Sequence, residues 1–171
     1  GDLDRVMEIG PVFRSEKSLT HRHLTEFTGC DMEMCFNDHY HEVLDMLSLT
    51  FNYIFDGLNS RYKEEIESVR KQHPFEDLKY QHPCLRITYA EGMKLLREQG
   101  PAILEERIAK ETCPETKKRM LAHIESVKVH PDLEDISTED EKLLGEVVSR
   151  EYGQDFYIMD KFPLHIRPFY S

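Results

Sequence analysis

The sequence lacks the features that mark membrane proteins, secreted proteins and general polyanion binders. No hydrophobic run approaches the roughly 20 apolar residues of a membrane-spanning helix, and the first residues form no signal-peptide pattern. Only four cysteines occur in 171 residues, without paired spacing, so we expect reduced thiols in a cytosolic protein. Basic residues are also scarce, with 22 Lys and Arg against 33 Asp and Glu. The resulting net charge of -11 argues against a general polyanion binder.

The chain also has no repeat at a fixed period, no low-complexity segment and no initiator methionine. Its length is sufficient for one domain with a hydrophobic core. We expect an α+β fold in which an antiparallel sheet is flanked by helices. That sheet is expected to contain two strands within Val6–Met34 and two strands near the end of the chain, Asp155–Asp160 and Leu164–Tyr170.

The clearest pattern lies in the stretch Val6–Met34, where two β-type runs flank a charged, His-rich loop. Side chains alternate between the two faces along each run. In an antiparallel pair, one face is apolar and is expected to contact a core; it holds Met7, Ile9, Phe13, Cys30, Met32 and Met34. The opposite face gathers Arg14, Glu16, Phe27, Asp31 and Glu33.

The second face combines a guanidinium, carboxylates, an aromatic ring and the gap left by Gly29. A guanidinium binds a carboxylate or phosphate through paired hydrogen bonds, and an aromatic ring can stack on a planar base. Carboxylates can hold an ammonium group or a metal ion. The face therefore suits a nucleotide together with an amino acid. The alternative is a hairpin with ordinary cross-strand ion pairs at its surface.

These residues also carry a family resemblance. FRSE at Phe13–Glu16, the loop THRHLTEF and the run GCDMEM resemble the second signature motif of class II aminoacyl-tRNA synthetases, and more narrowly of eukaryotic and archaeal-type aspartyl-tRNA synthetases. Four later segments fit the same family: His39–Asp45, Val69–Pro74, Leu85–Gly92 and Asp155–Tyr170. The resemblance is poorest over 101–134, where we expect an inserted, exposed helical appendage.

The resemblance implies that residues 1–171 are part of a catalytic domain, with 6–34 as its motif 2 hairpin. The implied activity is ATP-dependent activation of L-aspartate to aspartyl-adenylate, followed by transfer to tRNA(Asp). It further implies Mg²⁺, with its main protein ligand outside this segment, a homodimer in the intact protein, a cytoplasmic location and no membrane association. We expect the fragment alone to be inactive or nearly so, because the resemblance places the main Mg²⁺ ligand, the arginine that reads the aspartate side chain and the arginine that binds the γ-phosphate beyond Ser171.

The resemblance also assigns roles to individual residues. Arg14 is the implied catalytic residue, which binds the α-phosphate of ATP and the α-carboxylate of aspartate together. The implied ATP-binding set is Arg14, Ser15, Glu16, Arg22, His23, Leu24 and Phe27. Aspartate is held by Arg14, Asp31 and Glu33, and the acceptor end of tRNA meets Glu16, Ser18 and Thr20. No residue is assigned to a metal ion.

Three other functions stay open at this point. An asparaginyl-tRNA synthetase shares the fold and the motif, although the DMEM run and the THRHLTEF loop favour aspartate. A non-catalytic module on a synthetase-like fold binds ATP, tRNA or a protein partner without ligation. A soluble acidic interaction domain, finally, could carry a hairpin that mimics the motif.

Apolar spacing predicts helices in the middle of the chain. A helix is predicted over about Asp38–Gly57, capped by Asn37 or Asp38. Its apolar residues recur at three and four positions, which indicates a buried stripe: Val43, Leu44, Leu47, Phe51, Ile54, Phe55 and Leu58. A second helix is predicted over Ser60–Gln72, and a short strand over Leu85–Thr88.

Two capping boxes mark later helices. The box formed by Thr88 and Glu91 predicts a helix to about Gln99, which Gly100 and Pro101 end. The segment 101–134 is predicted to form two polar helices broken near Cys113–Pro114. A second box, Thr138 with Glu141, predicts a helix over Glu139–Glu151. Its inward residues are expected to be Leu143, Leu144, Val147 and Val148.

Overall fold

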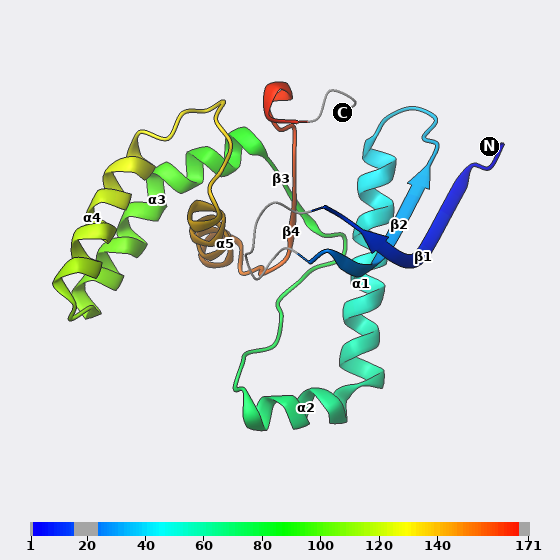
Figure 1. The fold of residues 1–171 in the computed structure, drawn as a ribbon, viewed down its shortest axis with the longest axis horizontal. Helices are drawn as coiled ribbons and strands as arrows, with labels where there is room; N and C mark the ends of the chain where they lie inside the picture. Colours follow the sequence, from blue (N-terminus) through cyan, green and yellow to red (C-terminus); the bar gives the residue numbers. More distant parts are fainter. Residues whose placement is uncertain (1, 16–23, 168–171) are drawn as a thin grey trace. The chain divides into compact units, whose positions relative to one another are not determined.

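The computed structural model describes residues 2–15 and 24–167 (Figure 1). The chain divides into two compact units, Gly1–Met46 and Leu47–Ser171. Both helices and strands are present, so the predicted α+β class is confirmed. In the described part of the chain, no helix is both long enough and apolar enough to cross a membrane.

The first unit contains the antiparallel strands β1 (Arg5–Phe13) and β2 (Glu26–Met34), and the start of α1 (His41–Arg61). The connection between β2 and α1 is fixed by Glu42. Its carboxylate accepts hydrogen bonds from the backbone N–H groups of Asn37 and Asp38, at 3.0 and 2.9 Å. These backbone bonds, above all the one from Asp38, lower the pKa of Glu42. The helix therefore begins later than predicted, and a carboxylate of its first turn binds the residues that were expected to cap it.

The prediction that the apolar face of the hairpin contacts a core is wrong for the described residues. Met7, Ile9 and Phe13 expose 66%, 63% and 70% of their surface. Cys30 is exposed as well, and Met32 and Met34 are half-buried. Alternation determines which side chains share a face, but a face is buried only where another layer covers it.

The second unit holds the remainder of α1 and the later elements. They are, in order, α2 (Lys63–Gln72), β3 (Leu85–Thr88), α3 (Tyr89–Lys110), α4 (Pro114–Lys128), α5 (Thr138–Tyr152), β4 (Tyr157–Asp160) and a 3₁₀ helix at Leu164–Ile166. α3 packs against both α4 and α5. The core of this unit lies among these three helices. The four residues of α5 predicted to face inward are confirmed, since Leu143, Leu144, Val147 and Val148 are each at most 1% exposed.

The sheet of the second unit differs from the prediction. β3 and β4 pair in parallel, from Leu85 opposite Tyr157 to Thr88 opposite Asp160, whereas one antiparallel sheet was expected to include the C-terminal strands and the hairpin. A parallel pair needs a long crossover connection, and α3, α4 and α5 provide it. The segment predicted as a last strand over Leu164–Tyr170 instead forms a 3₁₀ helix in its described part.

The predicted helix end at Gly100–Pro101 is also wrong, because α3 runs through both residues to Lys110. Both are buried, and a Cβ at Gly100 would lie 3.1 Å from Leu143 Cδ2. Close packing of α3 on α5 therefore outweighs the local tendency of Gly and Pro to end a helix.

The segment 101–134 is helical and broken at Cys113–Pro114, as predicted, but it is not an exposed appendage. Ile103, Leu104, Ile124 and Val127 are each at most 3% exposed and belong to the core. Whether this segment is an insertion relative to its relatives stays a prediction.

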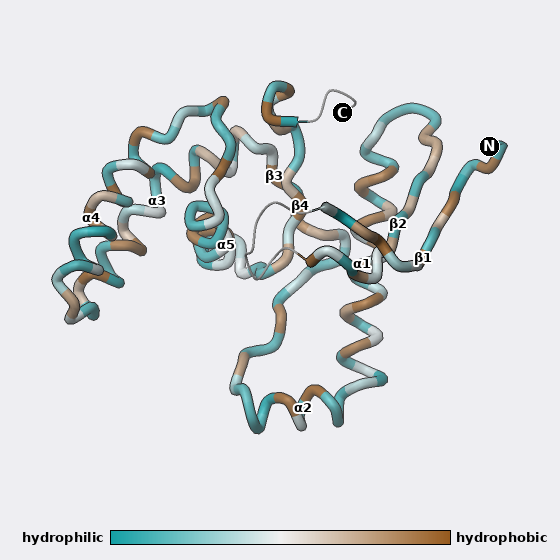
Figure 2. The backbone as a smooth tube through the Cα atoms, in the orientation of Figure 1, coloured by the Kyte–Doolittle hydropathy of each residue, from teal (hydrophilic) through white to brown (hydrophobic). Residues whose placement is uncertain are grey.

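The predicted stripe of α1 is only partly buried. Figure 2 shows apolar residues recurring along this helix, yet Phe51, Ile54 and Leu58 remain 40%, 45% and 42% exposed. The buried residues of α1 are polar: Ser48 and Asn52, each 2% exposed. The Ser48 hydroxyl accepts a hydrogen bond from the N–H of Cys84 at 2.9 Å and so anchors the loop before β3.

The capping box at Thr88 and Glu91 is confirmed in full, but the second box is displaced by one residue. Ser137 is the N-cap of α5, and its hydroxyl accepts from the Asp140 N–H at 3.1 Å. Asp140 in turn lies 2.7 Å from Nε2 of His123 on α4. With Ser137 as the N-cap, Asp140 can both complete the cap and contact His123 of α4.

Candidate functional site

The register of β1 and β2 separates the two faces of the hairpin as the sequence predicted. The opposing pairs on the polar face are Val6–Glu33, Glu8–Asp31, Gly10–Gly29 and Val12–Phe27. Arg14 continues this face beyond the last pair of β1, where its N–H donates to the carbonyl oxygen of Thr25 at 2.9 Å. The side chains of Arg14, Phe27 and Asp31 are thus held on one surface by the backbone hydrogen-bond ladder.

A cavity of about 310 Å³ lies on this face, and Arg14, Phe27 and Asp31 all line it. The guanidinium carbon of Arg14 lies 5.9 Å from the centroid of the Phe27 ring, at the outer range of a cation–π contact. Among the described residues Arg14 has no carboxylate partner. Its hydrogen-bond donors are therefore available to an anion bound over the Phe27 ring.

The floor of the cavity depends on a glycine. A Cβ atom added to Gly29 would lie 2.6 Å from Cγ2 of Val12, closer than real contacts allow. Gly10, directly opposite on β1, has ordinary room, because its Cβ would lie 3.6 Å from the nearest atom, an oxygen of Glu8. The backbone of β2 is therefore open to the cavity at Gly29 because only glycine fits against Val12.

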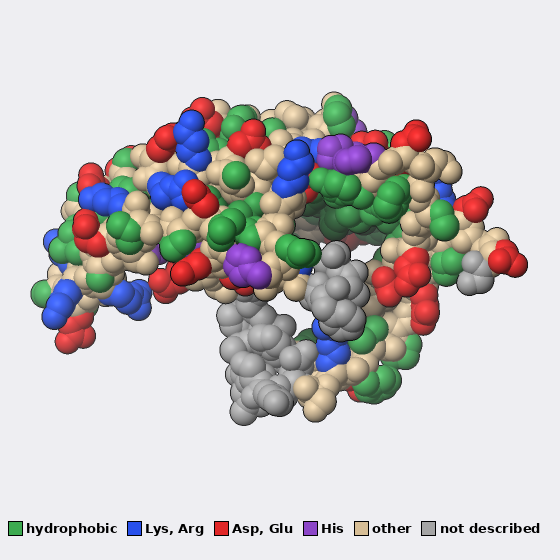
Figure 3. Space-filling view, turned by 90° about the horizontal axis from the view of Figure 1, so that it is seen from above, with side chains coloured by type: hydrophobic (Ala, Val, Ile, Leu, Met, Phe, Trp, Pro, Cys, Tyr) green, Lys and Arg blue, Asp and Glu red, His purple; other side chains and the backbone are tan. Residues whose placement is uncertain are grey.

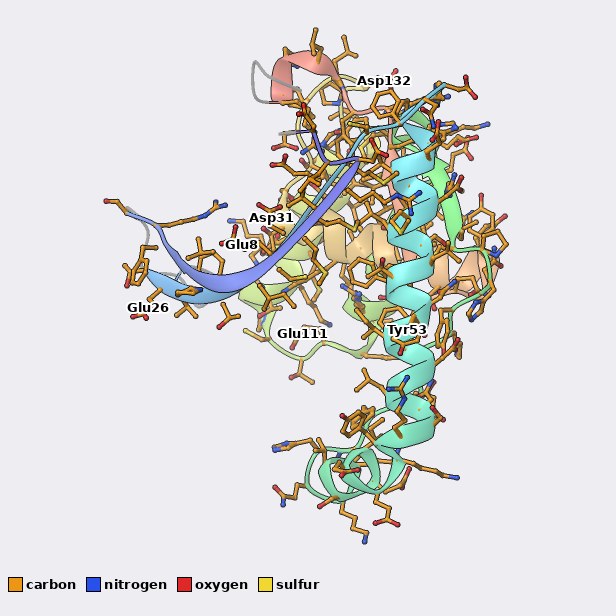
Figure 4. All side chains as sticks on the ribbon, turned by 90° about the vertical axis from the view of Figure 1, so that its right-hand side faces the viewer. Glu8, Glu26, Asp31, Tyr53, Glu111 and Asp132 are labelled. Atoms are coloured by element: carbon orange, nitrogen blue, oxygen red, sulfur yellow. The ribbon has the colours of Figure 1, made fainter. Side chains whose placement is uncertain are left out.

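Two carboxylates oppose each other at one end of the cavity. Glu8 and Asp31 are direct cross-strand partners and both line it, and Figure 4 shows them close together on the hairpin, away from Glu26. Like charges in this arrangement repel, so a cation bound between them would stabilise the pair. Glu8 was not among the predicted site residues, although its place in the alternation of β1 already put it on this face.

The other predicted residues divide into three groups. Glu33 lies on the same face but lines a separate cavity of about 240 Å³ with Val6 and Cys35. Ser15 and Leu24 are exposed and do not line the main cavity. The remaining predicted residues, Glu16, Ser18, Thr20, Arg22 and His23, lie outside the described residues.

The polar face of the β1–β2 hairpin has a positive end at Arg14 and a negative end at Glu8 and Asp31. The Arg14 end can hold an anion beside an aromatic ring, and the Glu8–Asp31 end can hold a cation. A zwitterionic amino acid next to a phosphate presents both charges to such a surface. Within residues 2–15 and 24–167, no three or more His, Cys, Asp or Glu side chains gather as a metal-binding group.

Comparison with known families gives one match over the whole chain. The family described as tRNA synthetases class II (D, K and N) matches residues 1–171. The hairpin segments that suggested this family lie within the matched range.

Individual relatives are similar over nearly the entire chain. The cytoplasmic aspartate–tRNA ligase of Homo sapiens is 44% identical over 170 residues, which are 99% of this chain and 28% of that protein. Aspartate–tRNA ligase 2 of Arabidopsis thaliana, also cytoplasmic, is 42% identical over 171 residues, 100% of this chain and 26% of that protein. The solved structure of an aspartyl-tRNA synthetase from Entamoeba histolytica superimposes with a TM-score of 0.74 at 42% identity, covering 98% of this chain and 29% of that one. The chain thus spans less than a third of the length of these relatives.

Proposed function

Because the chain belongs to the class II tRNA synthetases of the D, K and N group, we propose that the protein containing it is an aspartate–tRNA ligase. Such an enzyme joins L-aspartate to ATP, releases pyrophosphate, and then transfers the aspartyl group of the adenylate to tRNA(Asp). The observation that carries the proposal is the single cavity lined by Arg14, Phe27 and Asp31. Each of these residues has a distinct task in the first step.

Arg14 acts on the reacting anions. The aspartate carboxylate attacks the α-phosphorus of ATP, and two negative groups must approach each other for this bond to form. A guanidinium bridging the α-carboxylate and the α-phosphate aligns them and offsets their repulsion. The absence of a carboxylate partner for Arg14 among the described residues supports this role, since none of those residues uses its planar donor fork.

Phe27 and the acidic pair position the two substrates. The Phe27 ring lies beside Arg14 and stacks under the adenine base, which a planar aromatic surface favours. Asp31, opposed by Glu8, binds the ammonium group of aspartate and exchanges a repulsive contact for an attractive one. Glu33, further along the same face, supports the ammonium site.

The family resemblance extends these roles to Ser15 and Leu24 and to residues outside the described part of the chain. Glu16 accepts a hydrogen bond from the adenine amino group, and Arg22 and His23 approach the β- and γ-phosphates together with the backbone of Leu24. Ser18 and Thr20 meet the acceptor end of tRNA. Ser15 contributes to ATP binding next to Arg14.

The proposal includes Mg²⁺ as the ion that accompanies ATP. The described residues do not supply a group of three or more metal ligands, so within residues 2–15 and 24–167 the fit to a protein-bound Mg²⁺ is incomplete. We also propose a cytoplasmic location, because the names of the relatives include the word cytoplasmic. For the intact protein we propose a homodimer. Light scattering of the complete protein measures the oligomeric state.

The function is tested by ATP–pyrophosphate exchange with the complete protein. We expect exchange that depends on aspartate, and charging of tRNA(Asp) with aspartate in the same preparation. Exchange with asparagine in place of aspartate would assign the protein to the asparaginyl branch of the family. Absence of exchange with either amino acid, in a protein that still binds ATP, would favour a non-catalytic module.

A further inference from the structure

A second cavity, of about 250 Å³, lies among α3, α4 and α5 in the second unit. Its apolar side is formed by Leu104 of α3 and Met120 of α4. Leu104 is only 2% exposed and belongs to the core, so this side of the cavity is fixed by packed residues. None of the residues that line it comes from the hairpin.

The polar lining of this cavity is mostly cationic. Arg107, Arg119 and Lys142 contribute three permanent positive charges from three different helices, against one carboxylate, Glu139. The chain as a whole has the opposite balance, with 33 acidic and 22 basic residues. Figure 3 shows Lys and Arg side chains mixed with carboxylates on the visible face of the α3–α4 region, so the mostly cationic lining of the cavity differs from that face.

Of the three cations, Arg107 is already paired within the part of the chain that the structure describes, whereas Arg119 and Lys142 are not. Arg107 pairs with Glu146 of α5, and the lining residue His123 contacts Asp140 through Nε2 at 2.7 Å. Among the described residues, Arg119 and Lys142 have no ion-pair or hydrogen-bond partner. Both are exposed side chains that line the cavity, one from α4 and one from α5, so an anion bound in it would meet two cations that pair with no carboxylate of the described residues.

We propose that this cavity binds a phosphate group between Arg119 and Lys142. Its volume corresponds to roughly eight liquid water molecules, which suits a tetrahedral oxyanion and is below the range of about 300–1,000 Å³ for sites that enclose larger ligands. Donors that approach from two helices match the several oxygens of a phosphate better than the two coplanar oxygens of a carboxylate. The site goes beyond the proposed activity and does not depend on it.

The test measures binding of inorganic phosphate to the complete protein at constant ionic strength, by calorimetry and by ³¹P line broadening. The variants are Arg119→Gln and Lys142→Gln, and the matched control is Lys118→Gln, which removes the same charge from the neighbouring position of α4 outside the cavity. A fourth variant, Glu139→Gln, removes the carboxylate that the described residues contribute to the lining. Thermal unfolding of each variant verifies that it is folded.

We expect saturable binding that each of the first two variants weakens by about tenfold or more, because each removes a charge-assisted hydrogen bond. Glu139→Gln should tighten binding by roughly fivefold, since it removes a repulsive charge. Lys118→Gln should have little effect, because Lys118 does not line the cavity and so donates no hydrogen bond to an anion bound there. No saturable binding by the parent protein, or equal losses in Arg119→Gln and Lys118→Gln, would overturn the proposal.

A second arm identifies the source of the phosphate. If the group belongs to RNA, Arg119→Gln weakens binding of tRNA and inorganic phosphate competes with it. If the affinity for tRNA is unchanged while phosphate binding is lost, the ligand is a free phosphate compound. Both results support the site. Whether the site exists is decided by phosphate binding to the parent protein and by the comparison of Arg119→Gln with Lys118→Gln.

Discussion

Replacing Gly29 by alanine should disturb the hairpin through one specific contact. The added Cβ would lie 2.6 Å from Cγ2 of Val12 and 3.9 Å from its Cβ. Overpacking of this kind costs about 1–3 kcal/mol, which accelerates hydrogen exchange of the β1 and β2 amides by roughly 5- to 150-fold if local opening limits exchange. Exchange measured by mass spectrometry on peptides from the two strands gives this quantity directly.

Two further variants isolate the contact. Val12→Ala removes Cγ2, so the Gly29→Ala change made in that background meets Cβ of residue 12 at 3.9 Å and the Gly10 carbonyl oxygen at 4.0 Å, both ordinary contacts, and should be nearly neutral. Gly10→Ala is the matched control, because it adds the same atom to the opposing residue with 3.6 Å of room. If Gly29→Ala is equally harmful with and without Val12, steric closeness is not the reason for the glycine.

Three other perturbations follow from particular contacts. Ser137→Ala removes the N-cap of α5 and should lower stability by about 1 kcal/mol, seen as a lower melting temperature that Ser137→Asp largely restores. Phe27→Ala should raise the KM for ATP by a factor corresponding to roughly 1–3 kcal/mol of stacking, and an unchanged KM would remove Phe27 from the adenine site. Because the pKa of Glu42 is lowered from its ordinary 4.5, its ionised form stabilises the fold above that pH, and the contribution is lost as the pH falls through the lowered value. Glu42→Gln should therefore reduce the melting temperature near neutral pH but not in acid, and a loss of equal size at both would contradict the linkage.

Features set by neighbouring residues were predicted well. The alternation of β1 and β2 predicted which side chains share a face, because the period of two leaves no freedom once the strands pair. The capping box of Thr88 and Glu91 was likewise predicted, since all its atoms come from one turn. Local patterns alone therefore predicted that Arg14, Phe27 and Asp31 share one face of the hairpin.

Features set by distant packing were not predicted. α3 continues through Pro101 because Gly100 lies against Leu143 of α5, a contact that local propensity does not contain. The parallel pairing of β3 with β4 depends on the crossover formed by three helices, and Leu164–Ile166 turns into a 3₁₀ helix after Phe162, whose ring packs on Tyr89 at 4.9 Å. In the site, Glu8 was overlooked because its importance comes from the carboxylate opposite it.

The central claim is that Arg14 aligns the anions that react. It is tested most directly by the rate of aspartate-dependent ATP–pyrophosphate exchange in Arg14→Ala and Arg14→Lys variants of the complete protein. Arg61→Ala is the control, because it removes an exposed guanidinium that binds the Tyr53 hydroxyl and lies over the Tyr53 ring. We predict a loss of about 10²–10³-fold in kcat for Arg14→Ala, a loss that persists in Arg14→Lys because the planar fork is missing, and nearly unchanged exchange in the control. Exchange by Arg14→Ala at a rate close to that of the parent protein would contradict the account.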